Sequence, residues 1–186
     1  YKDFGTQNTW DVNVTLLKEL GYTLADVENR SYYEFGELLE AAKQAKGDDF
    51  YPLNIEPAVL ERMVTNSIIV NGDSGACNVL SYYIDPTDVS KDLGSKIVAK
   101  FATEEFKKFA EQTRAYYEAG YIDPAAANAQ TSNDTLTQKQ SSAQYLIGTQ
   151  SYALGYEVQT SAERGIEVAY VPCTPPYVDK TSTQGA

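Results

Sequence analysis

Side chains that could contact a ligand follow a short apolar run in the first third of the chain, in the stretch Asn54-Ile55-Glu56-Pro57-Ala58. We expect a strand to end here and a helix to begin, because proline is well tolerated at the first helical position. Ligands of open α/β domains bind outside the carboxyl ends of strands, where a helix start also offers free amides. Glu56 and Pro57 are therefore candidate ligand-binding residues, and a solvated turn is the competing explanation of Glu56.

A second candidate stretch follows the apolar residues Tyr145-Leu146-Ile147, where we expect a strand that ends at Gly148. Glycine after a strand allows a ligand or a neighbouring backbone to come close. The residues that follow could form hydrogen bonds and offer an aromatic ring for stacking. The candidate binding residues here are Thr149, Gln150, Ser151 and Tyr152.

Tyrosine is unusually frequent, with 15 tyrosines against 6 phenylalanines. Its apolar face and polar edge suit a hydrated binding surface, although most tyrosines in any domain are structural. The candidates for such a surface lie near predicted turns: Tyr82, Tyr83, Tyr152 and Tyr177. We place Trp10, the only tryptophan, in the core or at a hinge and not at a ligand.

The sequence contains no histidine, which excludes Ser-His-Asp and Cys-His catalysis and zinc sites with histidine ligands. Cys77 and Cys173 lack metal-ligand spacing and leave a single disulfide between them possible. Two carboxylates about 5 to 9.5 Å apart would be enough for glycoside hydrolysis, but nothing in the sequence pairs with Glu56. We therefore expect no catalytic residue, no metal and no cofactor.

The charge balance argues against polyanionic partners. The net charge is −11, from 26 acidic and 15 basic residues, whereas affinity for nucleic acid rests largely on Lys and Arg. Apolar residues make up 42% of the chain, and no apolar run approaches the roughly 18 residues of a membrane span. A chain of 186 residues is long enough for one substantial core, so we expect a single globular domain without nucleic-acid partners.

The clearest predicted element is a helix that begins at Thr103, which can cap its first turn. Gly120 suits a left-handed stop, and Asp123-Pro124 prevents continuation. An apolar stripe with helical periodicity predicts that one face packs on a sheet. The stripe contains Phe106, Phe109, Ala110, Thr113, Tyr116 and Tyr117.

Shorter patterns predict alternating strands and helices along the rest of the chain. Ser31 and Glu34 match a capping box, which predicts that a helix starts there and stops at Gly47. Thr23 and Asp26 form a similar start signal. Strands are predicted near Trp10–Val14, Phe50–Ile55, Ile68–Val70, Lys96–Phe101 and Ile166–Val171, and a further helix over Val14–Leu20. This alternation indicates an α/β layered domain, with helices on both faces of a parallel or mixed sheet.

The order of several motifs resembles the extracellular solute-binding proteins of bacterial ABC importers, the family that includes maltose-binding protein. No single motif is specific, but together they span most of the chain. The motifs are the Leu16-Leu17-Lys18-Glu19-Leu20-Gly21 opening, the capped helix from Ser31, the Glu56-Pro57 turn, the Tyr116-Tyr117-x-x-Gly120-x-Ile122-Asp123-Pro124 helix end, the Gly148 turn and the final Ile166–Pro172 strand.

This resemblance implies one lobe of a type II periplasmic-binding-protein-like fold, with residues 1–186 forming the second lobe and the first lobe absent. The chain begins at Tyr1 without methionine, as an excised or processed fragment would. The family traps a small solute by closure of two lobes about a hinge and delivers it to a membrane permease. We therefore expect an extracellular, lipid-anchored receptor whose ligand is an oligosaccharide, and weak binding by this lobe alone.

The resemblance also supplies roles for the two candidate stretches. The Glu56-Pro57 turn is similar to the Asn-x-x-Glu-Pro turn that contacts sugar in maltose-binding protein, and is one residue shorter here. The Gly148 turn is similar to the Gly-x-Trp turn of the family, with Gln150 in the place of the tryptophan and Tyr152 nearby. Two other classes remain open: a carbohydrate-active hydrolase that uses Glu56, and a non-transport surface module that binds glycan or protein.

Overall fold

A computed structural model describes residues 7–65, 69–70, 80–83, 97–127, 144–152, 159 and 161–173 of the 186. Tyr177 and Cys77 lie outside these residues. Within them, no helix is both long and apolar enough to cross a bilayer.

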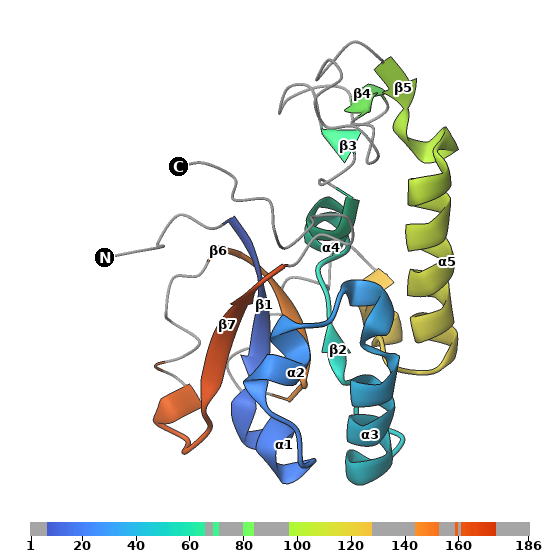
Figure 1. The fold of residues 1–186 in the computed structure, drawn as a ribbon. Helices are drawn as coiled ribbons and strands as arrows, with labels where there is room; N and C mark the ends of the chain where they lie inside the picture. Colours follow the sequence, from blue (N-terminus) through green and yellow to red (C-terminus); the bar gives the residue numbers. More distant parts are fainter. Residues whose placement is uncertain are drawn as a thin grey trace.

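A four-stranded mixed sheet forms the centre of the structure (Figure 1). Its strands are β1 (Gln7–Asn13), β2 (Leu53–Asn54), β6 (Ile147–Tyr152) and β7 (Val168–Pro172), in the order β2-β6-β1-β7. The central strand β1 is antiparallel to β6 and β7, whereas β2 runs parallel to β6. The structure therefore confirms the predicted α/β class.

Helices from the first two thirds of the chain pack with this sheet (Figure 1). They are α1 (Val14–Glu19), α2 (Leu24–Glu28), α3 (Gly36–Lys46), α4 (Pro57–Thr65) and α5 (Glu104–Glu118). The described residues also form three short 3₁₀ helices: η1 (Tyr32–Glu34) between α2 and α3, η2 (Lys100–Ala102) before α5, and η3 (Pro124–Ala127) after α5.

The hydrophobic core is built around Trp10, of which 1% is exposed. Its ring stacks with Tyr32 at 6.1 Å and meets Phe35 edge-on at 5.2 Å. Strand β1 presents Trp10 and Val12 to this core, because successive side chains of a strand point to opposite faces. The core position predicted for Trp10 is confirmed.

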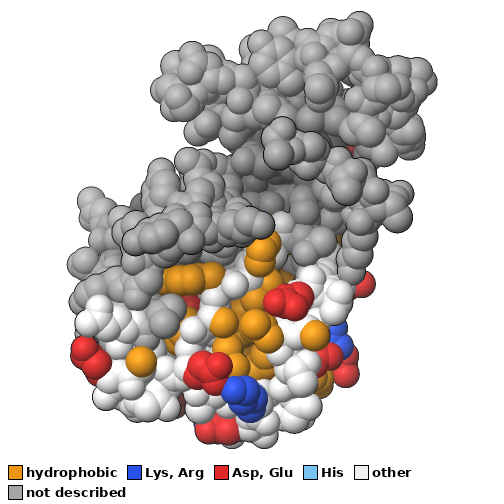
Figure 2. Space-filling view, turned by 60° about the vertical axis from the view of Figure 1, so that its left-hand side comes forward, with side chains coloured by type: hydrophobic (Ala, Val, Ile, Leu, Met, Phe, Trp, Pro, Cys, Tyr) orange, Lys and Arg blue, Asp and Glu red, His pale blue; other side chains and the backbone are white. Residues whose placement is uncertain are grey.

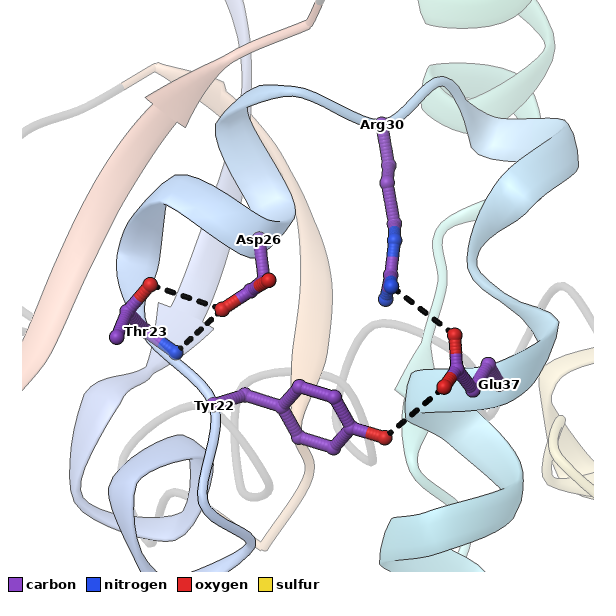
Figure 3. Close-up of polar contacts among 5 residues, drawn as sticks. All are labelled: Tyr22, Thr23, Asp26, Arg30 and Glu37. Atoms are coloured by element: carbon purple, nitrogen blue, oxygen red, sulfur yellow. Dashed lines mark hydrogen bonds and ion pairs between the residues drawn. The ribbon is translucent and has the colours of Figure 1, made fainter.

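Local sequence signals set the α2–α3 corner (Figure 3). The Thr23 amide and hydroxyl both donate to Asp26 Oδ2, at 2.7 and 2.8 Å, as the start signal predicts. Glu37 accepts hydrogen bonds from Arg30 at 3.0 Å and from Tyr22 at 3.5 Å. These contacts join the two helices through exposed polar side chains.

The Ser31–Glu34 capping box is present but opens a different element from the one predicted. The Ser31 amide donates to Glu34 Oε2 at 2.8 Å, and the turn that it caps is the 3₁₀ helix η1. Helix α3 begins only at Gly36, after Phe35 has turned into the core. The predicted stop at Gly47 is correct.

Helix α5 has the predicted caps but a different packing partner. Thr103 Oγ1 accepts from the Phe106 amide at 3.2 Å, and Gly120 has a φ of 73°. The helix packs against α4 and, through Tyr116, against η1, and it stands apart from the four-stranded sheet in Figure 1. The prediction that its stripe packs directly on the sheet is therefore wrong, because α4 and η1 lie between α5 and that sheet.

A second, three-stranded antiparallel sheet leads into α5. Its strands are β3 (Ile69–Val70), β4 (Leu80–Tyr83) and β5 (Ile97–Ala99). Figure 1 shows it at the end of α5 where that helix begins.

The described surface reflects the negative net charge of the chain. In Figure 2, acidic side chains are spread over the described part of one face, and apolar side chains gather near its middle.

Candidate functional site

The two stretches singled out in the sequence lie side by side. The parallel pairing of β2 with β6 places Asn54 opposite Gly148. Immediately after β2, the Glu56 amide donates to Thr149 Oγ1 at 2.8 Å. The structure thus joins the Glu56-Pro57 turn to the strand that carries the second candidate stretch, 93 residues away in sequence.

The candidate side chains of the turn lie at or near the surface, whereas Thr149, which holds the turn, is buried. Glu56 is half-buried and Pro57 is exposed, and Pro57 begins α4 as predicted. Thr149 is 2% exposed, and its hydroxyl binds the Glu56 amide. Thr149 is therefore a buried residue whose hydroxyl holds the backbone of the turn in position.

The other candidate residues are only partly placed. Gln150, Ser151 and Tyr152 continue β6, where Gln150 pairs with Thr9 across to β1. Tyr82 lies in β4 opposite Val70. The side chains of these four lie outside the described part, as does all of Tyr177, so their ligand contacts stay predictions.

Gly148 does not end a strand. Strand β6 begins at Ile147 and runs through Gly148 to Tyr152, so that prediction is wrong. A Cβ at Gly148 would lie 3.3 Å from Tyr145 Cε2 and 3.5 Å from the Asn54 carbonyl oxygen. The missing side chain at Gly148 therefore lets the Tyr145 ring and the β2 backbone come close. The sequence predicts that a glycine here allows either a ligand or a neighbouring backbone to approach, and the structure shows the approach of the backbone.

Tyr145 is itself fixed in place. Its ring is completely buried, and its hydroxyl donates to Asp11 Oδ2 at 2.6 Å. Asp11 sits opposite Gly148 in the β1–β6 pairing. The ring consequently spans Gly148 and ties the start of β6 to β1.

A groove of about 500 Å³ opens beside the turn, between the start of α4, one edge of α5 and η3. Residues of all these segments line it, among them Ile55, Pro57, Ala110, Arg114, Tyr117 and Ala126. Ala110 and Tyr117 belong to the apolar stripe that was expected to be buried, yet both are exposed, Tyr117 by 46%. Sequence reasoning missed the groove because periodicity does not distinguish the edge of a stripe from its centre.

The groove is apolar with a single charged residue among its described lining residues, Arg114. Arg114 Nε donates to Glu118 Oε1 at 2.8 Å, and this hydrogen bond raises the pKa of Arg114. The Thr113 hydroxyl donates to the Phe109 carbonyl at 2.8 Å and lies 3.0 Å from the Tyr32 hydroxyl. No carboxylate lines the described wall, so the groove suits an uncharged ligand with an apolar face.

Buried tyrosines hold the groove wall in position. The Tyr116 hydroxyl donates to the Tyr32 carbonyl at 2.9 Å, and burial raises the pKa of Tyr116 to about 12. The Tyr121 hydroxyl donates to Glu40 Oε2 at 2.7 Å. These bonds fasten the C-terminal half of α5 to η1 and α3, which confirms a structural role for these tyrosines.

Cys173 is a free thiol in the structure. Its Sγ donates to the Met63 carbonyl at 3.4 Å, and burial raises its pKa to about 12. Among the described residues, no group of three or more His, Cys, Asp or Glu could hold a metal ion.

No protein-family model matches the sequence, and no curated protein matches it either. The fold is similar to that of the N-glycan transport solute binding protein NgtS from Streptococcus pneumoniae. Its complex with Man5GlcNAc aligns with a TM-score of 0.58 and 21% identity, over 92% of this chain and 34% of that chain. Its complex with Man1GlcNAc gives 0.55 and 19%, over 91% of this chain and 36% of that chain.

A further structure of NgtS aligns with a TM-score of 0.54 and 20% identity. It covers 89% of this chain and 33% of that chain, so this chain spans about a third of the length of the structures it matches. At these identities the likeness shows the shared fold alone, and this is the α/β fold that the sequence predicts.

Proposed function

We propose that this chain forms the second lobe of a solute-binding protein that captures an oligosaccharide for a bacterial ABC importer. The observation that carries the proposal is the Glu56-Pro57 turn, fixed to β6 by Thr149 and opening beside an apolar groove with an exposed tyrosine. A solute-binding-protein fold supports the same function. The similar protein NgtS is a glycan-transport protein by name, with sugar complexes.

The turn offers the chemistry that a sugar needs. A carboxylate such as Glu56 accepts hydrogen bonds from sugar hydroxyls, and charge-assisted hydrogen bonds are roughly twice as strong as neutral ones. Because the Glu56 amide is bound to Thr149, the carboxylate is presented from a fixed backbone. Gln150, Ser151, Tyr152, Tyr82 and Tyr177 are the further ligand contacts that we propose on this lobe.

The ligand would be enclosed by closure of a first lobe over this one and then passed to the membrane permease. We propose binding without turnover, since sugar hydrolysis needs a second carboxylate near the first and none lines the described groove.

The proposal places the intact protein outside the cell on a lipid anchor. Partition of the intact protein into the aqueous phase of a detergent extraction would contradict the anchor.

Replacement of the Glu56 carboxylate tests the function. We expect Glu56→Ala in the intact protein to weaken oligosaccharide binding by about ten- to a hundredfold, because a hydrogen bond to a charged group contributes about 1.5–3 kcal/mol. Isothermal titration calorimetry with mannose-containing oligosaccharides measures the affinity. Glu163→Ala, which removes an exposed carboxylate from a distant turn, is the matched control and should leave the affinity unchanged.

Two results would contradict the proposal. One is binding of peptides and no binding of sugars by the intact protein. The other is turnover of a chromogenic glycoside that Glu56→Gln abolishes, which would establish the hydrolase class instead.

A further inference from the structure

A row of three residues crosses the sheet next to the Glu56 turn, and two of them are unusual for a sheet interior. The strand pairings place Asp11 of β1 opposite Gly148 of β6, and Gly148 opposite Asn54 at the end of β2. Glycine weakens a strand, and burial of a carboxylate is costly, yet Asp11 is completely buried. Such exceptions to local preference are expected at functional or strained sites.

The Tyr145 ring connects the members of this row. Its hydroxyl donates to Asp11 Oδ2 at 2.6 Å, and its Cε2 would lie 3.3 Å from a Cβ at Gly148. The Asn54 carbonyl oxygen lies against the same position, at 3.5 Å. The space at Gly148 is therefore shared between a ring that is held by β1 and the backbone of β2.

Strand β2 depends on these contacts more than the longer strands do. It has only two residues, whereas β1 has seven. The Pro52 carbonyl, just before β2, accepts hydrogen bonds from the Leu146 and Ile147 amides at 2.9 and 3.0 Å. These two amides directly follow Tyr145. The start of β6 therefore helps to position the end of β2, and the Glu56 turn comes next.

We propose that Asp11 is a positioning residue for the ligand: through the Tyr145 hydroxyl it sets where the Glu56 carboxylate meets the sugar. The inference rests on the proposed function and names a determinant of affinity that does not touch the ligand. A hydrogen bond weakens steeply as its geometry departs from linear, so a small displacement of the turn changes the affinity. Stability alone does not require this pair, because replacing both partners of a buried polar contact by apolar groups is often neutral or stabilising.

Removal of one hydroxyl tests the inference on the intact protein. Tyr145→Phe keeps the ring at Gly148 and removes its hydrogen bond to Asp11. We expect the affinity for mannose-containing oligosaccharides to fall about three- to tenfold, less than for Glu56→Ala, because the carboxylate is displaced and not removed. Isothermal titration calorimetry measures the affinity, and a thermal melt measures the stability.

A double variant separates positioning from stability. Tyr145→Phe alone takes this hydrogen bond from a buried carboxylate, so it should lower the melting temperature. Asp11→Leu combined with Tyr145→Phe replaces both polar groups by apolar ones of similar shape, so the melting temperature should recover. We expect the affinity of the double variant to stay at the lower value. Recovery of the affinity together with the stability would show a purely structural role and overturn the inference.

Dependence on Glu56 gives a second readout. In the Glu56→Ala background the turn has no carboxylate left to position, so Tyr145→Phe should change the affinity by less than about twofold. Thr23→Val is the matched control, because it removes another hydrogen bond from a hydroxyl to a carboxylate, at 2.8 Å, from the α2–α3 corner (Figure 3). This control should lower the melting temperature and leave the sugar affinity unchanged.

The outcomes separate this inference from the function on which it rests. Unchanged affinity of Tyr145→Phe, beside a clear loss in Glu56→Ala, overturns the role of Asp11 and leaves the function standing. An equal loss from Tyr145→Phe with and without the Glu56 carboxylate also overturns it, since the hydroxyl would then act elsewhere. Sugar binding that Glu56→Ala does not weaken overturns the role of the turn and this inference with it. Absence of any sugar binding overturns the proposed function as well.

Discussion

Gly148 shows how a residue with no side chain can determine where others lie. It is buried within β6, and the Tyr145 ring and the Asn54 carbonyl occupy the space that a Cβ would need. The Tyr145 ring has little freedom to move, because it is fully buried and its hydroxyl is bound to Asp11. The position of the β2 end, and with it the Glu56 turn, depends on this close approach.

We therefore expect Gly148→Ala to destabilise the protein by about 1–2 kcal/mol, the usual cost of adding a methyl group to a well-packed interior. Gly36→Ala is the matched control, since a Cβ there would meet Tyr116 Cε1 at an ordinary 3.8 Å. Urea unfolding of the two variants measures the difference. Equal stabilities would mean that the Tyr145 ring shifts freely.

At the scale of elements, the groove depends on how α5 is held. A hydrogen bond of 2.7 Å joins Tyr121, after the end of α5, to Glu40 on α3. It lowers the pKa of Glu40 below its ordinary value of 4.5, with a smaller contribution from Gln44. Burial, and then Glu40 itself, raises the pKa of Tyr121 to about 12.

These shifts give a pH window for the stability that the bond contributes. The lowered pKa of Glu40 means that the contribution is present above pH 4.5 and is lost as the pH falls through the folded-state pKa. The raised pKa of Tyr121 means that it is present below pH 10 and is lost as the pH rises toward about 12. We expect Tyr121→Phe to lower the melting temperature by a few degrees at neutral pH and to have a smaller effect as the pH falls below 4.5.

Scanning calorimetry between pH 3 and pH 8 measures this dependence. Tyr117→Phe is the control at the same helix end and should leave the melting temperature unchanged at every pH. An effect of Tyr121→Phe that is equally large at pH 8 and at pH 3 would show that the hydroxyl does not act through its hydrogen bond to the ionised Glu40.

Sequence signals that act within a few residues predicted the elements well. Thr103, Gly120 and the Thr23–Asp26 pair cap turns through contacts with near neighbours, so their residue types suffice. The Glu56-Pro57 turn was also predictable, because proline fixes the first turn of a helix.

Contacts between distant segments were beyond the sequence. The bond between the Glu56 amide and Thr149 joins residues 93 positions apart, and periodicity cannot show that α4 and η1 separate α5 from the sheet. The exposure of Tyr117 follows from that arrangement. All of these features, and the candidate groove with them, depend on tertiary contacts that local sequence patterns do not show.

For the whole molecule, we expect residues 1–186 alone to bind sugar weakly. The proposed first lobe would supply the remaining contacts, and without closure the ligand stays open to solvent. Calorimetry on residues 1–186 and on the intact protein, at the same sugar concentrations, compares the two. Affinity of residues 1–186 equal to that of the intact protein would contradict the two-lobed proposal.

The place of Trp10 also decides what optical spectroscopy can observe. It is the only tryptophan of the chain, and 1% of it is exposed, between Tyr32 and Phe35. The tryptophan fluorescence of this chain therefore comes from a single residue in the middle of the core. The wavelength of its emission reports whether the core of this lobe is intact, and unfolding of the lobe can be followed at this single residue.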